Sequence, residues 1–238
     1  MTTDRTARDQ VRADERKLSR VRRNVTLATA FREFIRHPTP WMIVVFLGGS
    51  IVARILVGNW VWTDALVPVV MVVSFPLVEW LIHVFILHWR PKALGRITVD
   101  SLLSRKHREH HSNPRDIPLI FIPWQVLCGV LPLALVLGLF AFGRVGLGLT
   151  FMVTLGILGL IYEWTHYLIH TDYKPKTRLY KATWRNHRFH HYKNEHYWFT
   201  VTTSGTADRL LRTDPDPDTV EKSPTAKNLH GATGTTSQ

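Results

Sequence analysis

The chain has 238 residues, 45% of them hydrophobic, which allows one sizeable core but is too short for two full catalytic domains. Its formal net charge of +12 is typical of nucleic-acid-binding proteins, yet the apolar residues gather in long runs that alternate with basic stretches. We therefore predict an integral membrane protein with no nucleic-acid partner. The single cysteine, Cys128, lies in an apolar run, which excludes an intrachain disulfide and a cysteine-based zinc finger.

The N-terminal stretch, residues 1–25, carries many charges and few apolar side chains, so we expect a disordered basic arm. It has no signal-peptide pattern, and we expect the first apolar run to direct insertion into the membrane. From Thr26 to His37, apolar residues recur at helical spacing opposite charged ones. This pattern is typical of a helix that lies in the membrane interface.

Four apolar runs follow, and each is long enough to cross a hydrocarbon core of about 30 Å as a helix. Pro118 and Pro123 indicate that the third run begins with an interfacial or re-entrant segment, and Pro68 and Pro76 predict kinks in the second. Arg54, within the first run, either reaches toward the interface or faces the bundle interior. The runs cover residues 41–57, 65–88, 117–142 and 145–170.

The basic residues predict the orientation in the membrane. All lysines and arginines except Arg54 and Arg144 fall at residues 1–40, at 89–116 or after His170. These three stretches alternate with pairs of apolar runs, so an even number of crossings places them on one side. The positive-inside rule makes that side cytoplasmic, together with both termini.

Histidine is costly near lipid and is the commonest metal ligand at neutral pH, which makes its distribution informative. His37 and His230 stand alone and are expected to be surface residues, while His196 either lines a substrate site or packs among aromatic residues. The other ten of the thirteen histidines form four groups, namely His83 and His88; His107, His110 and His111; His166 and His170; and His187, His190 and His191.

The spacing within these groups predicts helical faces. Positions i, i+3 and i+4 of a helix share one face, so each group of three is expected to point all its imidazoles at one spot. His83 and His88 are five residues apart and so about 140° out of phase on an α-helix. They must ligate different metals or lie where the helix is distorted, and the spacing does not choose between these arrangements.

Ten imidazoles exceed the needs of one ion, so we predict two metal ions held by His83, His88, His107, His110, His111, His166, His170, His187, His190 and His191. Iron, zinc, copper and nickel all accept imidazole ligands. Glu79 and Glu163 lie one turn before histidines and are candidates to fix imidazole tautomers as hydrogen-bond acceptors, or else to cap or pair with nearby arginines.

The motifs resemble those of the fatty acid hydroxylase and sterol desaturase superfamily of membrane di-metal oxygenases. The resemblance rests on His-Val-Phe-Ile-Leu-His at 83–88, His-Arg-Glu-His-His at 107–111, His-Tyr-Leu-Ile-His at 166–170 and His-Arg-Phe-His-His at 187–191. It covers about residues 27–212. The gaps within the first and third motifs are most similar to the fatty acid 2-hydroxylase branch, although that branch more often has Asp where Glu163 stands. Carotenoid hydroxylases are a weaker match.

This resemblance implies an all-α integral membrane domain over residues 26–212, with four transmembrane helices in two hairpins and a cytoplasmic helical cap that carries the metal site. It implies O2-dependent hydroxylation of a lipid acyl chain with two metal ions, for which iron is the usual metal; zinc is the alternative in purified protein. The electron donor would be a separate ferredoxin or haem carrier. Residues 213–238 have the composition of a disordered tail.

Other functions fit the residues less well. A sterol or carotenoid hydroxylase or desaturase of the same superfamily is the nearest alternative. A histidine-rich metal transporter would place its ligands at mid-membrane depth, whereas most of these histidines lie beyond the apolar runs. A zinc hydrolase would be expected to carry His-Glu-x-x-His, and that motif does not occur.

Overall fold

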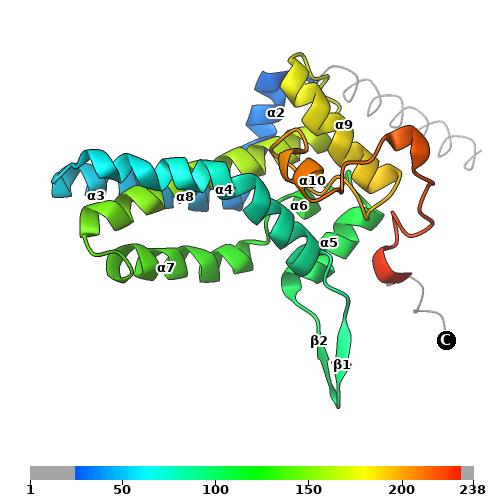
Figure 1. The fold of residues 1–238 in the computed structure, drawn as a ribbon, viewed down its shortest axis with the longest axis horizontal. Coiled ribbons are helices and arrows are strands. Elements are labelled where there is room, and N and C mark those ends of the chain that lie inside the picture. The colour runs from blue at the N-terminus through cyan, green and yellow to red at the C-terminus, as the bar shows by residue number, and fades with distance from the viewer. Residues whose placement is uncertain (1–24, 232–238) are drawn as a thin grey trace, which may run out of the picture.

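The computed structural model describes residues 25–231, and this part of the chain is largely helical (Figure 1). Short connections at the end of the bundle far from the termini join its four long helices into two antiparallel hairpins. Each hairpin arm is long and apolar enough to cross a membrane, so the predicted multi-pass architecture is confirmed. The four helices are α3 (Pro38–Val57), α4 (Leu66–Ile82), α7 (Trp124–Phe140) and α8 (Val145–His170).

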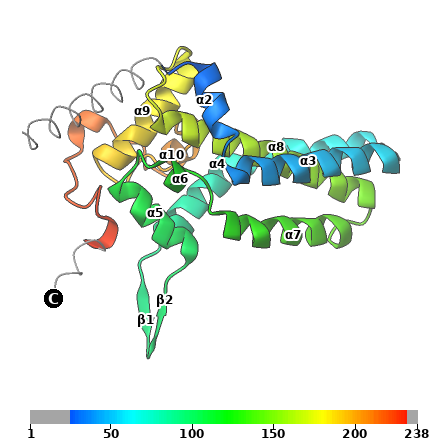
Figure 2. The ribbon, with the colours of Figure 1, turned by 180° about the vertical axis from the view of Figure 1, so that it is seen from behind.

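Shorter helices form a cap over one end of the bundle, as the view from behind also shows (Figure 2). The side chains of Thr26, Ser101 and Thr177 accept hydrogen bonds from backbone N–H groups and so begin α2, α5 and α9. The cap comprises α2 (Leu27–Phe34), η2 (His83–Leu87), α5 (Leu102–Ser112), α6 (Ile117–Ile120), α9 (Arg178–Tyr192), α10 (Thr206–Leu210), η3 (Pro217–Thr219) and η4 (Leu229–Gly231).

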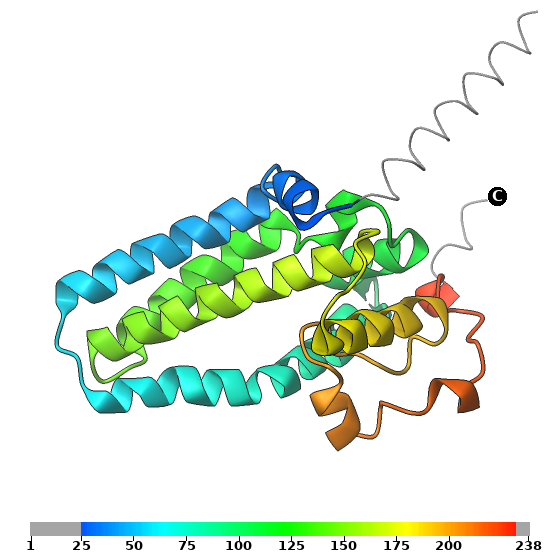
Figure 3. The ribbon, with the colours of Figure 1, turned by 90° about the horizontal axis from the view of Figure 1, so that it is seen from above.

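α8 lies between α3 and α4 and organises the bundle (Figure 3). Its small residues allow close approach to two neighbouring helices. A Cβ atom on Gly148 would lie 1.6 Å from the backbone oxygen of Gly138 in α7, and one on Gly156 would lie 2.9 Å from the Cβ atom of Leu47 in α3. Helices in lipid gain stability from such dispersion contacts, because burying apolar surface away from lipid gives no hydrophobic gain.

Exposed tryptophans mark both ends of the bundle. Trp41 and Trp124 lie in the first turns of α3 and α7 at the cap end, while Trp60 and Trp62 lie at the opposite end. Tryptophan is enriched at the level of lipid headgroups. The two pairs therefore indicate the two membrane interfaces, with the cap just beyond one of them.

The end of the bundle far from the cap is closed by charged residues. The buried Arg54 side chain donates to Asp64 Oδ2 at 2.7 Å and to Thr150 Oγ1 at 3.0 Å, and Arg144 bonds the other oxygen of Asp64. Arg54 thus faces the bundle interior, which was one of its two expected positions. One carboxylate joins a residue of α3 to the residue that precedes α8, and η1 (Trp62–Ala65) carries it.

Two features of the described chain differ from expectation. The stretch before α5 forms a two-stranded hairpin of β1 (Lys92–Leu94) and β2 (Ile97–Val99), which no periodicity predicted. The expected disordered tail is incorrect for residues 213–231, which pack on the cap through hydrogen bonds such as Ser223 N to Lys193 O at 2.8 Å. Residues 232–238, and the expected N-terminal arm apart from Val25, lie outside the described residues.

The close packing of α7 on α8 gives a test of the bundle. Replacing Gly148→Ala places a methyl group against the Gly138 backbone, which has no flexible side chain to move aside. We expect a loss of about 1–3 kcal/mol of stability, as for other overpacked cores, and a lower Tm for purified protein in detergent. Gly129→Ala in α7 is the matched control, because nothing lies within 4 Å of the added atom. Equal Tm values for both variants would contradict this packing.

Candidate metal centre

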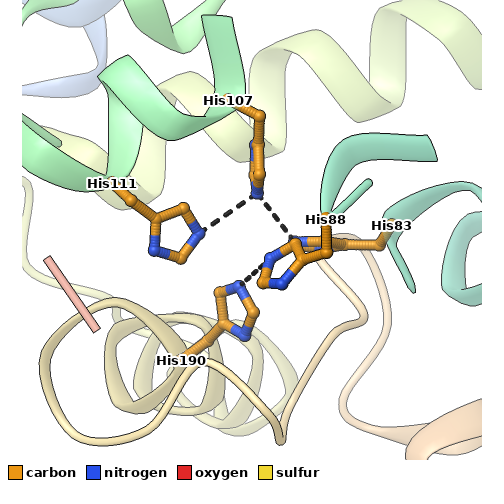
Figure 4. A group of neighbouring side chains, drawn as sticks. All are labelled: His83, His88, His107, His111 and His190. Carbon is orange, nitrogen blue, oxygen red and sulfur yellow. Dashed lines mark hydrogen bonds between the residues drawn. The ribbon is translucent and has the colours of Figure 1, made fainter. Parts of the chain in front are cut away.

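The structure brings the ten clustered histidines together in two groups of five. The candidate ligand nitrogens of each group lie within 4.8 Å of one another. Site 1 comprises His83, His88, His107, His111 and His190 (Figure 4), and site 2 comprises His110, His166, His170, His187 and His191. The sites adjoin, since the rings of His111 in site 1 and His191 in site 2 have centroids 4.2 Å apart.

The distances between nitrogens fit two metal ions. In site 1 the Nε2 atom of His107 lies 3.2 Å from that of His83 and 3.1 Å from that of His111. In site 2 the Nε2 atom of His187 lies 3.1 Å from those of His170 and His191. Two nitrogens bound to one ion at about 2.1 Å, with bond angles between octahedral and tetrahedral values, lie roughly 3.0–3.4 Å apart. In both groups the nitrogens are therefore as far apart as the ligands of a single metal ion, while metal ligation itself stays a prediction.

The groups of three do not each converge on one spot, so that expectation was wrong. In α5, His107 and His111 belong to site 1 and His110 belongs to site 2. In α9 the assignment is reversed, with His190 in site 1 and the flanking pair in site 2. Residues i and i+4 are about 40° apart on a helix, whereas the residue between them at i+3 is about 60° to the other side of i. The imidazoles at i and i+4 therefore face one site, and the imidazole at i+3 faces the neighbouring site.

The five-residue gap between His83 and His88 is explained by a distorted helix. Residues 83–87 form a π-helix in which the His88 amide donates to the His83 carbonyl at 2.9 Å, five residues earlier. The wider turn brings positions i and i+5 onto one face. Both imidazoles therefore lie in site 1, as the second of the two expected arrangements requires.

The imidazoles are buried, which favours their neutral form. Desolvation lowers the pKa of His190 to about 4, and desolvation followed by the neighbouring imidazoles lowers the pKa of His107, His111 and His187 well below its usual range. A neutral imidazole is the form that ligates a metal. The site is therefore ready to bind a cation at neutral pH without first losing protons.

Backbone carbonyls orient three imidazoles of site 1. The Nδ1 atoms of His83, His190 and His111 lie 2.5, 2.8 and 2.9 Å from the carbonyl oxygens of Phe199, Tyr197 and Ala226. A proton on each Nδ1 leaves the Nε2 lone pair free to face the metal position. In site 2, by contrast, the buried Nδ1 atoms of His187 and His191 have no hydrogen-bond partner among the described residues.

The carboxylates expected to support imidazoles bind backbone instead. Glu79 accepts hydrogen bonds from the amides of Val201 and Thr202, both at 2.9 Å, and Glu163 accepts from the Ile122 amide at 3.1 Å. Neither forms a hydrogen bond with an imidazole among the described residues. Their part in the site is indirect, because they fix segments that pass beside the histidines.

Asp208 is a supporting residue that the sequence reasoning missed. Its carboxylate accepts hydrogen bonds from the amides of Phe199 and Thr200 at 2.8 and 2.9 Å. It therefore fixes the peptide whose carbonyl faces His83. A buried aspartate on a five-residue helix carries no spacing signal, so only the folded chain reveals this contact.

The three isolated histidines have separate environments. The His196 side chain is 67% exposed beside Glu195, so the suggestion that it lines the site is incorrect. His37 stacks on Phe121 with ring centroids 4.3 Å apart. His230, expected on the surface, is half-buried, and its Nε2 atom lies 3.0 Å from the carbonyl oxygen of His88.

An apolar cavity of about 250 Å³ leads from the bundle to site 1. Helices α3, α4, α7 and α8 line it, and His83 lies at its cap end. A smaller cavity of about 40 Å³ touches His107 of site 1 and His110 and His166 of site 2. The two cavities share the lining residues Leu87, Leu103, Ile122 and Tyr162, so they adjoin and together reach both sites.

Comparisons with known proteins agree with this site. The family model for fatty acid hydroxylase matches residues 68–213, which include all ten histidines of the two sites. A dihydroceramide fatty acyl 2-hydroxylase of Arabidopsis thaliana is 28% identical over 134 residues, or 56% of this chain. The chain spans about half of that relative's length, 54%. No solved structure gave a significant match.

The C-terminal segment beyond the matched region gives a test of the site. Truncation after residue 213 removes the Ala226 carbonyl from His111 and the His230 ring from the His88 carbonyl. Both histidines belong to site 1, and losing such supporting contacts typically weakens metal binding 10–100-fold. We expect metal titration of the truncated protein to show one weakened site and one unchanged site.

A shorter truncation, after residue 231, is the control and should bind metal as the full chain does. Loss of metal from both sites to the same extent in the longer truncation would contradict a specific role for this segment at site 1.

Proposed function

Because the chain belongs to the fatty acid hydroxylase family, we propose that it is a membrane-bound oxidoreductase that hydroxylates a lipid acyl chain with O2 as cosubstrate. The observation that carries this proposal is the apolar cavity that reaches His83 of site 1, beside a smaller cavity that touches histidines of both sites. Lipid tails in the surrounding membrane can enter such a cavity, and a reactive centre at the end of the cavity would meet an unactivated C–H bond of the acyl chain.

We propose further that the cap and both termini face the cytoplasm, as the distribution of basic residues predicts.

The ten histidines would hold two iron ions, with zinc able to compete for the same imidazole nitrogens. When bound, the metal pair supplies the activation of O2 that the protein's own side chains cannot provide. The carbonyls of Phe199, Tyr197 and Ala226 keep three of the imidazoles in the tautomer that exposes Nε2. Glu79 and Asp208 hold the segment that carries the first of these carbonyls.

The cavity favours one orientation of the acyl chain. Phe75 lies eight residues before His83 on the same helix, so the cavity extends about 12 Å from site 1 toward the middle of the bundle. A polar headgroup placed at that depth would be desolvated without partners, at a cost of several kcal/mol. We therefore propose that the tail enters the cavity while the headgroup stays near the cap, so that attack occurs close to the carboxyl end. The relative's name as a 2-hydroxylase agrees with this position.

The residues shared by the two cavities would exclude water from the reacting carbon. Leu87, Leu103 and Ile122 surround the passage with apolar atoms, and Tyr162 packs near His166 with ring centroids 5.7 Å apart. A dry passage protects a reactive centre from side reactions with solvent. It also holds the target methylene group in a narrow range of positions.

Electrons would come from a separate ferredoxin or haem carrier. Five basic residues are exposed along the α8–α9 connection and α9, which also carries ligands of both sites: Lys174, Lys176, Arg178, Lys181 and Arg185. An acidic carrier would be steered to this surface by complementary charge. Its docking there would place it against the helix that carries His187, His190 and His191.

The central test combines metal analysis with lipid analysis. We expect purified protein to bind close to two metal ions per chain, and membranes that contain it to accumulate a hydroxylated lipid only in air. His110→Ala should lower metal content and abolish the product, because His110 belongs to site 2. His196→Ala is the matched control, since this exposed histidine lies outside both sites. Unchanged metal content and lipid profile in His110→Ala would refute the proposal.

The cavity is tested by filling it. Gly159 lines the cavity, and a Cβ atom there would meet the Ile43 side chain at an ordinary 3.6 Å. Gly159→Ala should therefore be tolerated, whereas Gly159→Leu should displace a long acyl chain and lower its hydroxylation by about 100-fold. Metal content should remain at two ions per chain in both variants. If Gly159→Leu processed long chains as well as Gly159→Ala, the acyl chain would have to bind elsewhere.

A further inference from the structure

The β1–β2 hairpin has no part in either metal site or in the cavity. It projects away from the cap, and the antiparallel strands pair Lys92 with Val99 and Leu94 with Ile97. Gly95 in the connecting turn has φ of +62°, which a glycine adopts without strain. A two-stranded hairpin of this size is only marginally stable alone in water, so a further contact is expected to hold it.

One face of the hairpin is apolar and exposed. Side chains alternate between the two faces of a strand, so Leu94, Ile97 and Val99 share one face with Lys92. Leu94 is 73% exposed and Ile97 is 70% exposed. The opposite face carries only Ala93 and Thr98. Exposed aliphatic side chains gathered on one small face indicate a surface that is covered in the working protein.

The charges around this face are all positive. Arg90, Lys92 and Arg96 lie within residues 89–99, and this stretch contains no acidic residue. The next carboxylate, Asp100, is paired with Arg108 at 2.5 Å and accepts a hydrogen bond from Ser104. The apolar face is therefore bordered by three cations whose charge is not neutralised within the hairpin.

The hairpin also lies at the level of the membrane surface. It runs across the direction of the bundle helices, beyond their cap ends (Figure 1). Exposed Trp41 and Trp124 mark the interface at those ends. Trp89 stands at the base of the hairpin, where its Nε1 donates to Val99 O at 3.2 Å and its ring lies 4.9 Å from Lys92 Nζ. Tryptophan and lysine together are typical anchors at lipid headgroups.

We propose that the β1–β2 hairpin lies on the membrane surface, with Leu94 and Ile97 inserted into the interface and the three cations bound to anionic lipid headgroups. The bilayer that surrounds the bundle supplies both the apolar and the anionic part of this contact. Each basic residue near an anionic surface strengthens binding about fivefold. The hairpin would thus anchor the segment between His88 and α5, which connects two groups of site 1 histidines.

The test places a fluorescent label on the hairpin of the full chain in lipid nanodiscs that hold one copy each. In a Cys128→Ala background, Leu94→Cys receives an environment-sensitive label, and Thr219→Cys in η3 serves as the control. η3 lies on the side of the cap far from the bundle (Figure 1). We expect a blue-shifted emission and quenching by nitroxide lipids for the label at position 94, and neither effect for the label at 219.

Lipid composition tests the charged part. The quenching at position 94 should be stronger in discs of phosphatidylcholine with phosphatidylglycerol than in phosphatidylcholine alone. The combined change Arg90→Gln, Lys92→Gln and Arg96→Gln should remove this difference while leaving metal content unchanged. Equal emission from the two labelled positions, or a blue shift that occurs only in discs with two copies, would overturn the proposal. The second result would identify another copy of the chain as the occupant of the apolar face.

Discussion

Ten closely packed imidazoles, most of them buried, form the constraint on which the rest of the cap depends. Charged imidazoles would repel one another there, and neutral ones require partners for their nitrogens. The fold gathers the imidazole nitrogens into two groups and gives carbonyl partners to three Nδ1 atoms of site 1, whereas Nδ1 atoms of site 2 have no partner among the described residues. Helices α5 and α9 each contribute to both sites, so the two sites share one scaffold.

The support for the histidines is mostly backbone, and the carboxylates act one step further away. Glu79 and Asp208 both accept hydrogen bonds from amides of the segment at residues 199–202, and that segment gives the Phe199 carbonyl to His83. A carboxylate placed directly against the imidazoles would add negative charge to a buried site, whereas a carbonyl orients an imidazole without a formal charge. Glu79 and Glu163 lie close to the histidines along the chain, but their partners are backbone amides rather than imidazoles or arginines.

The membrane bundle and the cap meet at the apolar passage. Leu87 ends the π-helical turn after α4, and Tyr162 and His166 lie one helical turn apart on α8, so the same helices supply the cavity and the site. Small residues on α8 let α3 and α7 approach closely, and the cavity lies among all four long helices. The bundle and the cap therefore place the histidines at the cap end of an apolar cavity.

The four spans, the two-hairpin topology and the ten clustered histidines could be predicted from the sequence, because length, apolar composition and helical spacing are local properties of the chain. The division of the histidines into two sites could not be predicted, because it depends on tertiary contacts. The split of each group of three depends on which helices face each other, and the shared site of His83 and His88 depends on a π-helix that no spacing rule predicts. The packing of residues 213–231 on the cap was likewise hidden by their polar composition, because carbonyl and hydroxyl contacts to a distant site leave no periodic pattern.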